Sequence, residues 1–263
     1  MIEGAGDRAL WAALFGVLGL AVGSFLNVVI WRVPRGESVA HPASRCPGCG
    51  AAIRPWDNIP VVSWLVLRGK CRGCATSISA RYPIVEAGTA LLFALLALRF
   101  ELDWALAGFL VLGASLLAVA LIDLEHYIVP NRILVVVAPL GAAILAAVAL
   151  ADGKWDAFGR GVGGGVAAFA GLLVVHLISP RGMGMGDVKL AFVLGLFLGW
   201  LSWGHVALGM FLGFLLGAVV GGLLVVTGVR TRREAVPFAP FLAAGTMLAV
   251  FFGRGLLDWY SGL

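Results

Sequence analysis

The chain has 263 residues, of which 61% are hydrophobic and 13% are charged, and its net charge is +5. A mean hydropathy of +1.00 excludes an ordinary soluble domain and indicates a membrane protein. The positive charge does not suggest nucleic-acid binding, because no motif that combines basic and aromatic residues accompanies it.

Eight apolar runs are each close to the length that a helix needs to cross about 30 Å of hydrocarbon. They cover residues 10–30, 84–98, 104–122, 132–150, 157–178, 188–202, 205–227 and 237–257. The sequence therefore predicts an all-α polytopic protein with about eight transmembrane helices in a lipid bilayer. The second and sixth runs are short, so half-length or tilted helices would also fit them.

Three parts follow from this pattern. Residues 1–30 hold the first transmembrane helix, residues 31–83 form a polar insert, and residues 84–263 form the main transmembrane bundle. The first span is followed at once by a basic segment and lacks a cleavage site of small residues. We interpret it as a retained helix and not as a signal peptide.

The basic residues between the spans predict the orientation. With eight spans, 14 of the 19 Lys and Arg residues fall on the side that holds the insert, and five fall on the other side. The richer side is expected to be cytoplasmic. The insert then lies in the cytoplasm and both termini lie outside.

All four cysteines lie in the insert, as two CxxC pairs with 21 residues between them: Cys46, Cys49, Cys71 and Cys74. Two such turns can supply four thiolates to one tetrahedral Zn²⁺. Two disulfides or four free buried thiols are the alternatives, and a reducing cytoplasm disfavours the disulfides. A polar insert of this size has little apolar surface to bury, so a structural zinc ion would stabilise it.

Glycines recur in the later spans. Gly209, Gly213, Gly217 and Gly221 are spaced four residues apart, which places them on one helix face and predicts close packing of a neighbouring helix. The glycines of "GRGVGGG", before the fifth span, could serve the same purpose or loosen that helix.

Two aspartates lie where an apolar span meets the cytoplasmic side. Asp123, in "VALIDLEHYIVPN", ends the third span, and Asp187, in "GMGMGDVKL", opens the sixth. Carboxylates at such positions usually mark an ion path, a proton relay or a catalytic site. The alternative for Asp123 is a helix end at the interface, with Glu125 and His126 as further solvated groups.

Asp187 also has a structural alternative, because Asp is a favoured N-cap residue. However, Gly184 and Gly186 remove side chains beside it, which leaves space for another helix or an extended substrate, and capping does not need that space. If Asp123 and Asp187 meet, one carboxyl is held protonated while the other acts as a base, as in an aspartyl protease. Spacing alone does not show that they meet.

Five ordered segments carry a family resemblance: "GSFLNVVIWRVPRGES", the CxxC pairs flanking "WDNIPVVSWLVLRGKC", "ISARYPIVE", "LIDLEHYIVPN" and "GMGMGDVKL". The chain resembles the type IV prepilin peptidases, which are GxGD-type intramembrane aspartyl proteases. The resemblance implies that Asp123 and Asp187 are the catalytic pair. The second CxxC lacks the proline of the first, and some members of the family lack the cysteines altogether.

The resemblance also implies the substrate and the compartment. The enzyme would lie in the bacterial inner membrane and process prepilins of type IV pili or pseudopilins of type II secretion. Such substrates have a short basic leader ending in glycine, then phenylalanine or another apolar residue and a hydrophobic helix. Cleavage would occur at the cytoplasmic membrane surface.

A second activity implied by the resemblance is methylation of the new N-terminal amine with S-adenosylmethionine. No GxGxxG motif locates that cofactor. Gly69 and Lys70 of the "RGKC" segment are candidates, and a simple turn leading into the second CxxC pair is the alternative. A peptidase that lacks methyltransferase activity is a further possibility.

Two other function classes fit less of the sequence. A secondary transporter with a carboxylate pair would usually carry internal repeats, and none is visible. A zinc-bearing assembly scaffold would explain the insert but not the glycines beside Asp187.

Overall fold

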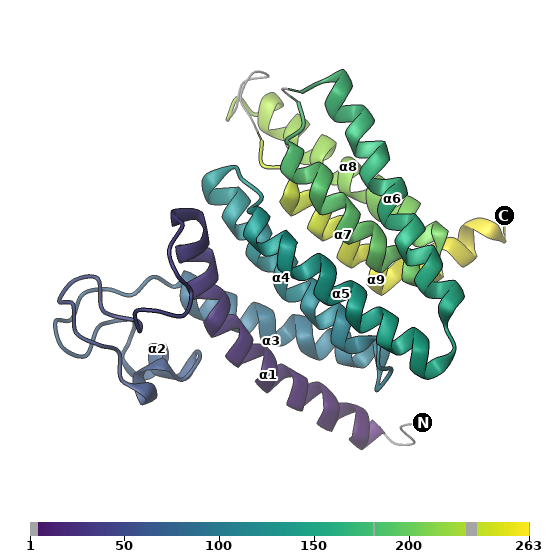
Figure 1. The fold of residues 1–263 in the computed structure, drawn as a ribbon. Coiled ribbons are helices and arrows are strands. Elements are labelled where there is room, and N and C mark those ends of the chain that lie inside the picture. Colours follow the sequence, from purple (N-terminus) through teal and green to yellow (C-terminus); the bar gives the residue numbers. More distant parts are fainter. Residues whose placement is uncertain (1–4, 181, 230–235, 263) are drawn as a thin grey trace. The chain divides into compact units, whose positions relative to one another are not determined.

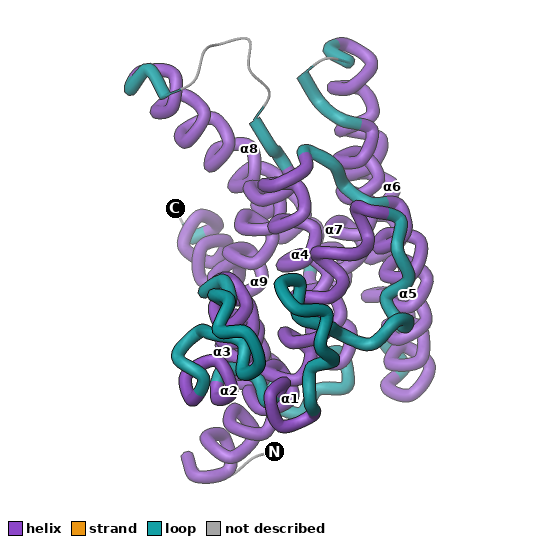
Figure 2. Tube along the Cα trace, turned by 90° about the vertical axis from the view of Figure 1, so that its left-hand side faces the viewer, coloured by secondary structure: helices purple, strands orange, loops and turns teal. Residues whose placement is uncertain are grey.

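A computed structural model describes residues 5–180, 182–229 and 236–262, and the regular elements in these ranges are all helices (Figures 1 and 2). Each of the eight apolar runs forms a helix, which confirms the all-α prediction. The long helices are α1 (Ala5–Arg32), α3 (Arg81–Phe100), α4 (Leu106–His126), α5 (Asn131–Asp152), α6 (Trp155–Ile178), α7 (Met185–Leu201), α8 (Trp203–Val226) and α9 (Ala239–Ser261). Four cations counted for the orientation lie outside the described residues: Arg181, Arg230, Arg232 and Arg233.

Seven of these helices, all except α7, are long and apolar enough to cross a membrane. A helix is suited to the hydrocarbon interior of a membrane, because its backbone N–H and C=O groups form hydrogen bonds within the helix itself. The sixth predicted span corresponds to α7, which has 17 residues and is about 26 Å long. That length is at the lower limit for a transmembrane helix.

Two compact units divide the chain, Met1–Leu106 and Ala107–Leu263. In the first, α1 packs along α3, and the insert that links them holds η1 (Val33–Arg35), η2 (Pro55–Asn58) and α2 (Val62–Val66) (Figure 1). A Cβ added at Gly19 would stand 2.7 Å from the Cα of Ala90, so the two backbones are in direct contact. The predicted division into residues 1–30, 31–83 and 84–263 stays a prediction.

In the second unit, α7 is the most buried helix and packs against α5, α6, α8 and α9. Glycines permit this approach. A Cβ at Gly164 of α6 would stand 2.6 Å from the carbonyl oxygen of Gly195 in α7, and one at Gly161 2.8 Å from the carbonyl oxygen of Leu196. The glycines of "GRGVGGG" thus serve packing, except Gly159, whose added Cβ would have no described neighbour within 4 Å. The ring of Phe197 meets the ring of Phe109 edge to face and fills the space beside Gly141.

The glycine stripe of α8 packs against its neighbours in three of its four positions. A Cβ at Gly209 would stand 2.6 Å from a methyl group of Leu198, one at Gly213 3.0 Å from Leu242, and one at Gly217 2.9 Å from Phe238. A Cβ at Gly221 would have no neighbour within 4 Å among the described residues. The packing prediction is thus confirmed for the first three glycines only.

Candidate functional site

Asp123 lies in the last turn of α4, with only 5% of its surface exposed. Its Oδ2 accepts a hydrogen bond of 3.0 Å from the main-chain N–H of Ala239, the first residue of α9. The carboxylate therefore satisfies one of the N–H groups that the start of a helix leaves without an intrahelical partner. It is a buried group and not one of several solvated groups at a helix end.

Asp187 lies in the first turn of α7, and it is not the N-cap. The N-cap is Gly184, and the N–H of Asp187 donates to the carbonyl oxygen of Gly184 at 3.1 Å. The side chain is 8% exposed, and its Oδ1 has no hydrogen-bond partner among the described residues. A buried carboxylate oxygen without a partner is costly, which favours a functional role over capping.

The two glycines before Asp187 have different neighbours. A Cβ added at Gly184 would stand 3.2 Å from Oδ2 of Asp187 itself. A Cβ at Gly186 would stand 2.8 Å from the Cβ of Val129, in the loop that follows α4. Glycine at both positions keeps the carboxylate unobstructed and lets the loop after α4 approach the start of α7.

Asp123 and Asp187 line one pocket of about 230 Å³. The other lining residues are Tyr127, Ile128, Val129, Gly184 and Gly186. Tyr127 has a φ of +56°, a strained conformation for an aromatic residue. The structure thus brings the two sequence-predicted aspartates together.

A hydrogen bond from α6 holds the segment before α7. The Nδ1–H of His176 donates to the carbonyl oxygen of Met183 at 2.7 Å, and the Met183 side chain is buried. The position of Gly184, which follows directly, is therefore fixed by a contact that no motif in the sequence indicates.

The sulfur atoms of Cys46, Cys49, Cys71 and Cys74 all lie within 4.8 Å of one another. The Sγ atoms of Cys46 and Cys74 are 3.7 Å apart. Four thiolates at the usual Zn–S distance of about 2.3 Å from a tetrahedral zinc are separated by about 3.8 Å. The cluster could therefore hold a metal ion with the geometry of a Cys₄ zinc site.

The two cysteine turns have the same backbone hydrogen bonds. The N–H of Cys46 donates to Ala51 O and that of Cys71 to Thr76 O, both at 2.9 Å. A hydrogen bond with the Thr76 hydroxyl lowers the pKa of Cys74 to about 6, whereas contacts with the sulfur atoms of Cys74 and Cys46 raise the pKa of Cys49 to about 11. A lowered thiol pKa favours the thiolate form that binds metal.

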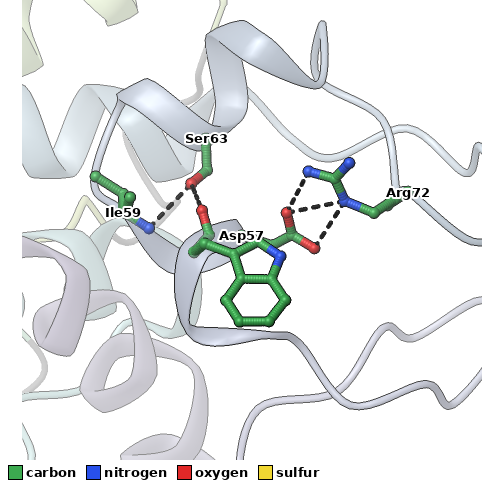
Figure 3. Close-up of polar contacts among 5 residues, drawn as sticks. Asp57, Ile59, Ser63 and Arg72 are labelled. Carbon is green, nitrogen blue, oxygen red and sulfur yellow. Dashed lines mark hydrogen bonds and ion pairs between the residues drawn. The ribbon is translucent and has the colours of Figure 1, made fainter.

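Polar contacts join the second cysteine turn to the rest of the insert (Figure 3). Arg72, between Cys71 and Cys74, makes a bidentate pair with Asp57, at 2.7 Å from Nη2 to Oδ1 and 3.0 Å from Nε to each carboxylate oxygen. Nearby, the Ser63 hydroxyl donates to Trp56 O and accepts from the N–H of Ile59. These contacts order residues that have little apolar core.

Gly69 and Lys70 lie in the turn that leads into the second cysteine pair. Gly69 has a φ of +66°, and a Cβ there would stand 2.9 Å from the indole ring of Trp64. Lys70 forms an isolated bridge with Ser77. These contacts account for both residues as parts of the turn, and their binding of S-adenosylmethionine stays a prediction.

Two family models match consecutive parts of the chain. Residues 17–100 match the bacterial peptidase A24 N-terminal domain, and residues 110–226 match the type IV leader peptidase family. A relative from Bacillus subtilis is 36% identical over 93% of this chain and 95% of its own length. The chain belongs to the type IV leader peptidase family.

Two further relatives of this leader peptidase family member are similar to it over most of its length. A protein of Myxococcus xanthus is 42% identical over 95% of this chain and 75% of its own length, and one of Pseudomonas aeruginosa is 34% identical over 93% and 91%. All three relatives are named prepilin leader peptidase/N-methyltransferase. No solved structure matches the chain.

Several residues that line the aspartate pocket of this leader peptidase family member have no functional signal in the sequence. Tyr127, Ile128 and Val129 line the pocket beside Asp123, whereas the sequence around them points only to its ionisable groups, Asp123, Glu125 and His126. The contact between Asp123 and Ala239 joins distant helices and has no sequence signal.

Proposed function

We propose that the protein is an aspartic endopeptidase that removes the basic leader from type IV prepilins or type II secretion pseudopilins. The observation that carries this proposal is the burial of Asp123 and Asp187 in one pocket. Membership of the leader peptidase family and the names of its relatives support the substrate class.

The chemistry needs one ionised and one protonated carboxyl. Two carboxylates that share a small pocket do not both ionise easily, so one retains a proton. The ionised carboxylate takes a proton from a water molecule, whose oxygen attacks the scissile carbonyl carbon. The other carboxyl protonates the carbonyl oxygen, and a proton then passes to the leaving amine as the C–N bond breaks.

The proposed setting is the bacterial inner membrane, with the pocket and the insert at the cytoplasmic surface. The excess of Lys and Arg on that side supports this orientation. A single-span substrate with a cytoplasmic leader would present its scissile bond at the same level as Asp123 and Asp187.

We further propose that the protein methylates the new N-terminal amine, as the names of its relatives suggest. S-adenosylmethionine would supply the methyl group. A structural Zn²⁺ held by the four cysteines would order the insert, and the mutual sulfur distances support that donor set. A member that retains only the peptidase activity is the alternative.

The test uses purified protein in detergent with a prepilin, and mass spectrometry of the product with and without S-adenosylmethionine. We expect loss of the leader in both cases and one added methyl group only with the methyl donor. An intact prepilin would refute the peptidase proposal. Cleavage without methylation would support the alternative of a peptidase alone.

A further inference from the structure

A second hollow lies between α5, α6 and α7, with a volume of about 620 Å³. We call it the α5–α7 groove. It is lined by Asn131, Leu134, Val135, Ala138, Val166, Phe169, Lys189, Phe192 and Val193. Seven of these nine side chains are apolar, so the groove is suited to an apolar occupant.

The lining follows one face of α5 and one face of α7. The α5 positions 131, 134, 135 and 138 and the α7 positions 189, 192 and 193 have the spacing of single helix faces. The α5 residues that line the groove extend about 10 Å along the helix axis, which is about the length of two turns of a second helix lying beside it. Phe192 forms part of the floor, where its ring packs against Gly165 of α6.

The groove has one polar end, and that end is next to the aspartate pocket. The ammonium of Lys189 donates a hydrogen bond of 3.0 Å to Oδ1 of Asn131. Asn131 comes two residues after Val129, and Lys189 comes two residues after Asp187; Val129 and Asp187 line the pocket. Polar side chains of this kind belong at the membrane surface, so the groove leads from the pocket toward the hydrocarbon.

We propose that the α5–α7 groove binds the first two turns of the apolar helix that follows the scissile bond of the substrate. This inference rests on the proposed function. The direction of the groove matches such a substrate, whose cleaved bond would lie at Asp123 and Asp187 and whose apolar segment would continue into the bilayer. The groove would thereby select substrates with an apolar segment directly after the cleavage site.

A phospholipid is the other conceivable occupant of an apolar groove in a membrane. Binding of anionic headgroups usually involves a cluster of basic residues. Lys189 is the only basic residue in the lining, and its ammonium already contacts Asn131. Continuity with the aspartate pocket therefore favours the substrate segment.

Photo-crosslinking tests the occupant directly. A benzophenone amino acid is introduced at Val135, which lines the groove and is 69% exposed, or at Val136, which does not line it and is 57% exposed. The full chain carries Asp187→Asn to prevent turnover and is placed in lipid nanodiscs. The probe is a synthetic single-span peptide with a basic leader, a Gly-Phe junction and an apolar helix.

We expect the probe at residue 135 to capture the peptide within about seven residues after the junction, and the probe at residue 136 to capture mainly lipid. Capture of lipid alone at residue 135, or equal capture of the peptide from both positions, would overturn the proposal.

Kinetics with an active enzyme provide the second test. Val135→Trp fills the groove, whereas Val136→Trp adds the same side chain outside it. For the single-span peptide, we expect Val135→Trp to lower kcat/KM by about tenfold or more, and Val136→Trp to have little effect. For a peptide cut short after the first apolar residue, both variants should match the unsubstituted enzyme.

The pattern of failure separates the two proposals. An unsubstituted enzyme that cleaves neither peptide refutes the proposed function. An active enzyme in which Val135→Trp affects both peptides equally, or neither, refutes the groove.

Discussion

The main-chain N–H of Ala239 donates a hydrogen bond to Oδ2 of Asp123, and both groups are buried. This contact gives Asp123 a structural role besides the proposed catalytic one. The two roles separate with different substitutions, because an asparagine retains a carbonyl oxygen that can accept the hydrogen bond and an alanine does not.

Asp123→Asn should therefore fold normally. Its rate of leader cleavage should fall by about a thousandfold or more, since an amide cannot take the proton from water. Asp123→Ala should also be less stable, by about 1 to 3 kcal/mol, because the N–H of Ala239 would be buried without a partner. Mass spectrometry of the leader and thermal unfolding in detergent measure the two effects. A folded Asp123→Asn protein with full cleavage would refute the aspartyl mechanism, and Glu125 would be the next residue to test.

Asp187→Asn should lower the rate of cleavage as much as Asp123→Asn does. The double variant should cleave scarcely more slowly than either single variant, because the two carboxyls act as a unit. Methylation of a substrate that has already been cut needs neither group and should survive. The assay scores leader loss and methyl addition separately on uncut and pre-cut substrate. Loss of both activities in folded protein would show that the two sites are coupled or shared.

Gly186→Ala should impair cleavage because its Cβ would lie 2.8 Å from that of Val129 and would force the loop away from Asp187. A displacement of about 1 Å can lower kcat by about 100-fold. Gly171→Ala is the matched control, since a Cβ at that position of α6 would meet no described residue within 4 Å. If both variants retain equal activity, the tight approach of Val129 is not required.

Cys46→Ser or Cys71→Ser should lower the zinc content from one ion per chain and make residues 31–83 more sensitive to protease. We expect methylation to decline more than cleavage, because the aspartate pocket is formed by other residues. Elemental analysis and limited proteolysis provide the measurements. A protein with four reduced thiols, no metal and a protected insert would contradict the zinc proposal.

Asp57→Asn should loosen the insert by removing the bidentate pair with Arg72. The guanidinium of Arg72 lowers the pKa of Asp57, so the pair stabilises the fold fully above the ordinary pKa of Asp, about 3.9, and loses that effect as the pH falls through the lowered value. The difference in protease sensitivity between Asp57→Asn and the unsubstituted protein should thus be the same at about pH 6 and pH 8. A difference that shrinks at pH 6 would show that Asp57 has a raised pKa instead.

The sequence by itself determined the helices and the metal-binding turns, because both depend on neighbouring residues. An apolar run in a bilayer must form a helix to satisfy its backbone hydrogen bonds, and all eight runs do so. Cys46 and Cys49 lie on one short turn, as do Cys71 and Cys74, so the CxxC spacing is itself a local signal.

Only the tertiary structure decided which distant groups meet. Asp123 ends α4 and Asp187 opens α7, and their shared pocket depends on how the intervening helices pack. Periodicity also could not distinguish Gly217, where an added Cβ would meet Phe238, from Gly221, where it would meet no described residue within 4 Å. The reason is physical: a helical pattern records which face of a helix is apolar or small, whereas the partner of that face is chosen by the packing of the whole bundle.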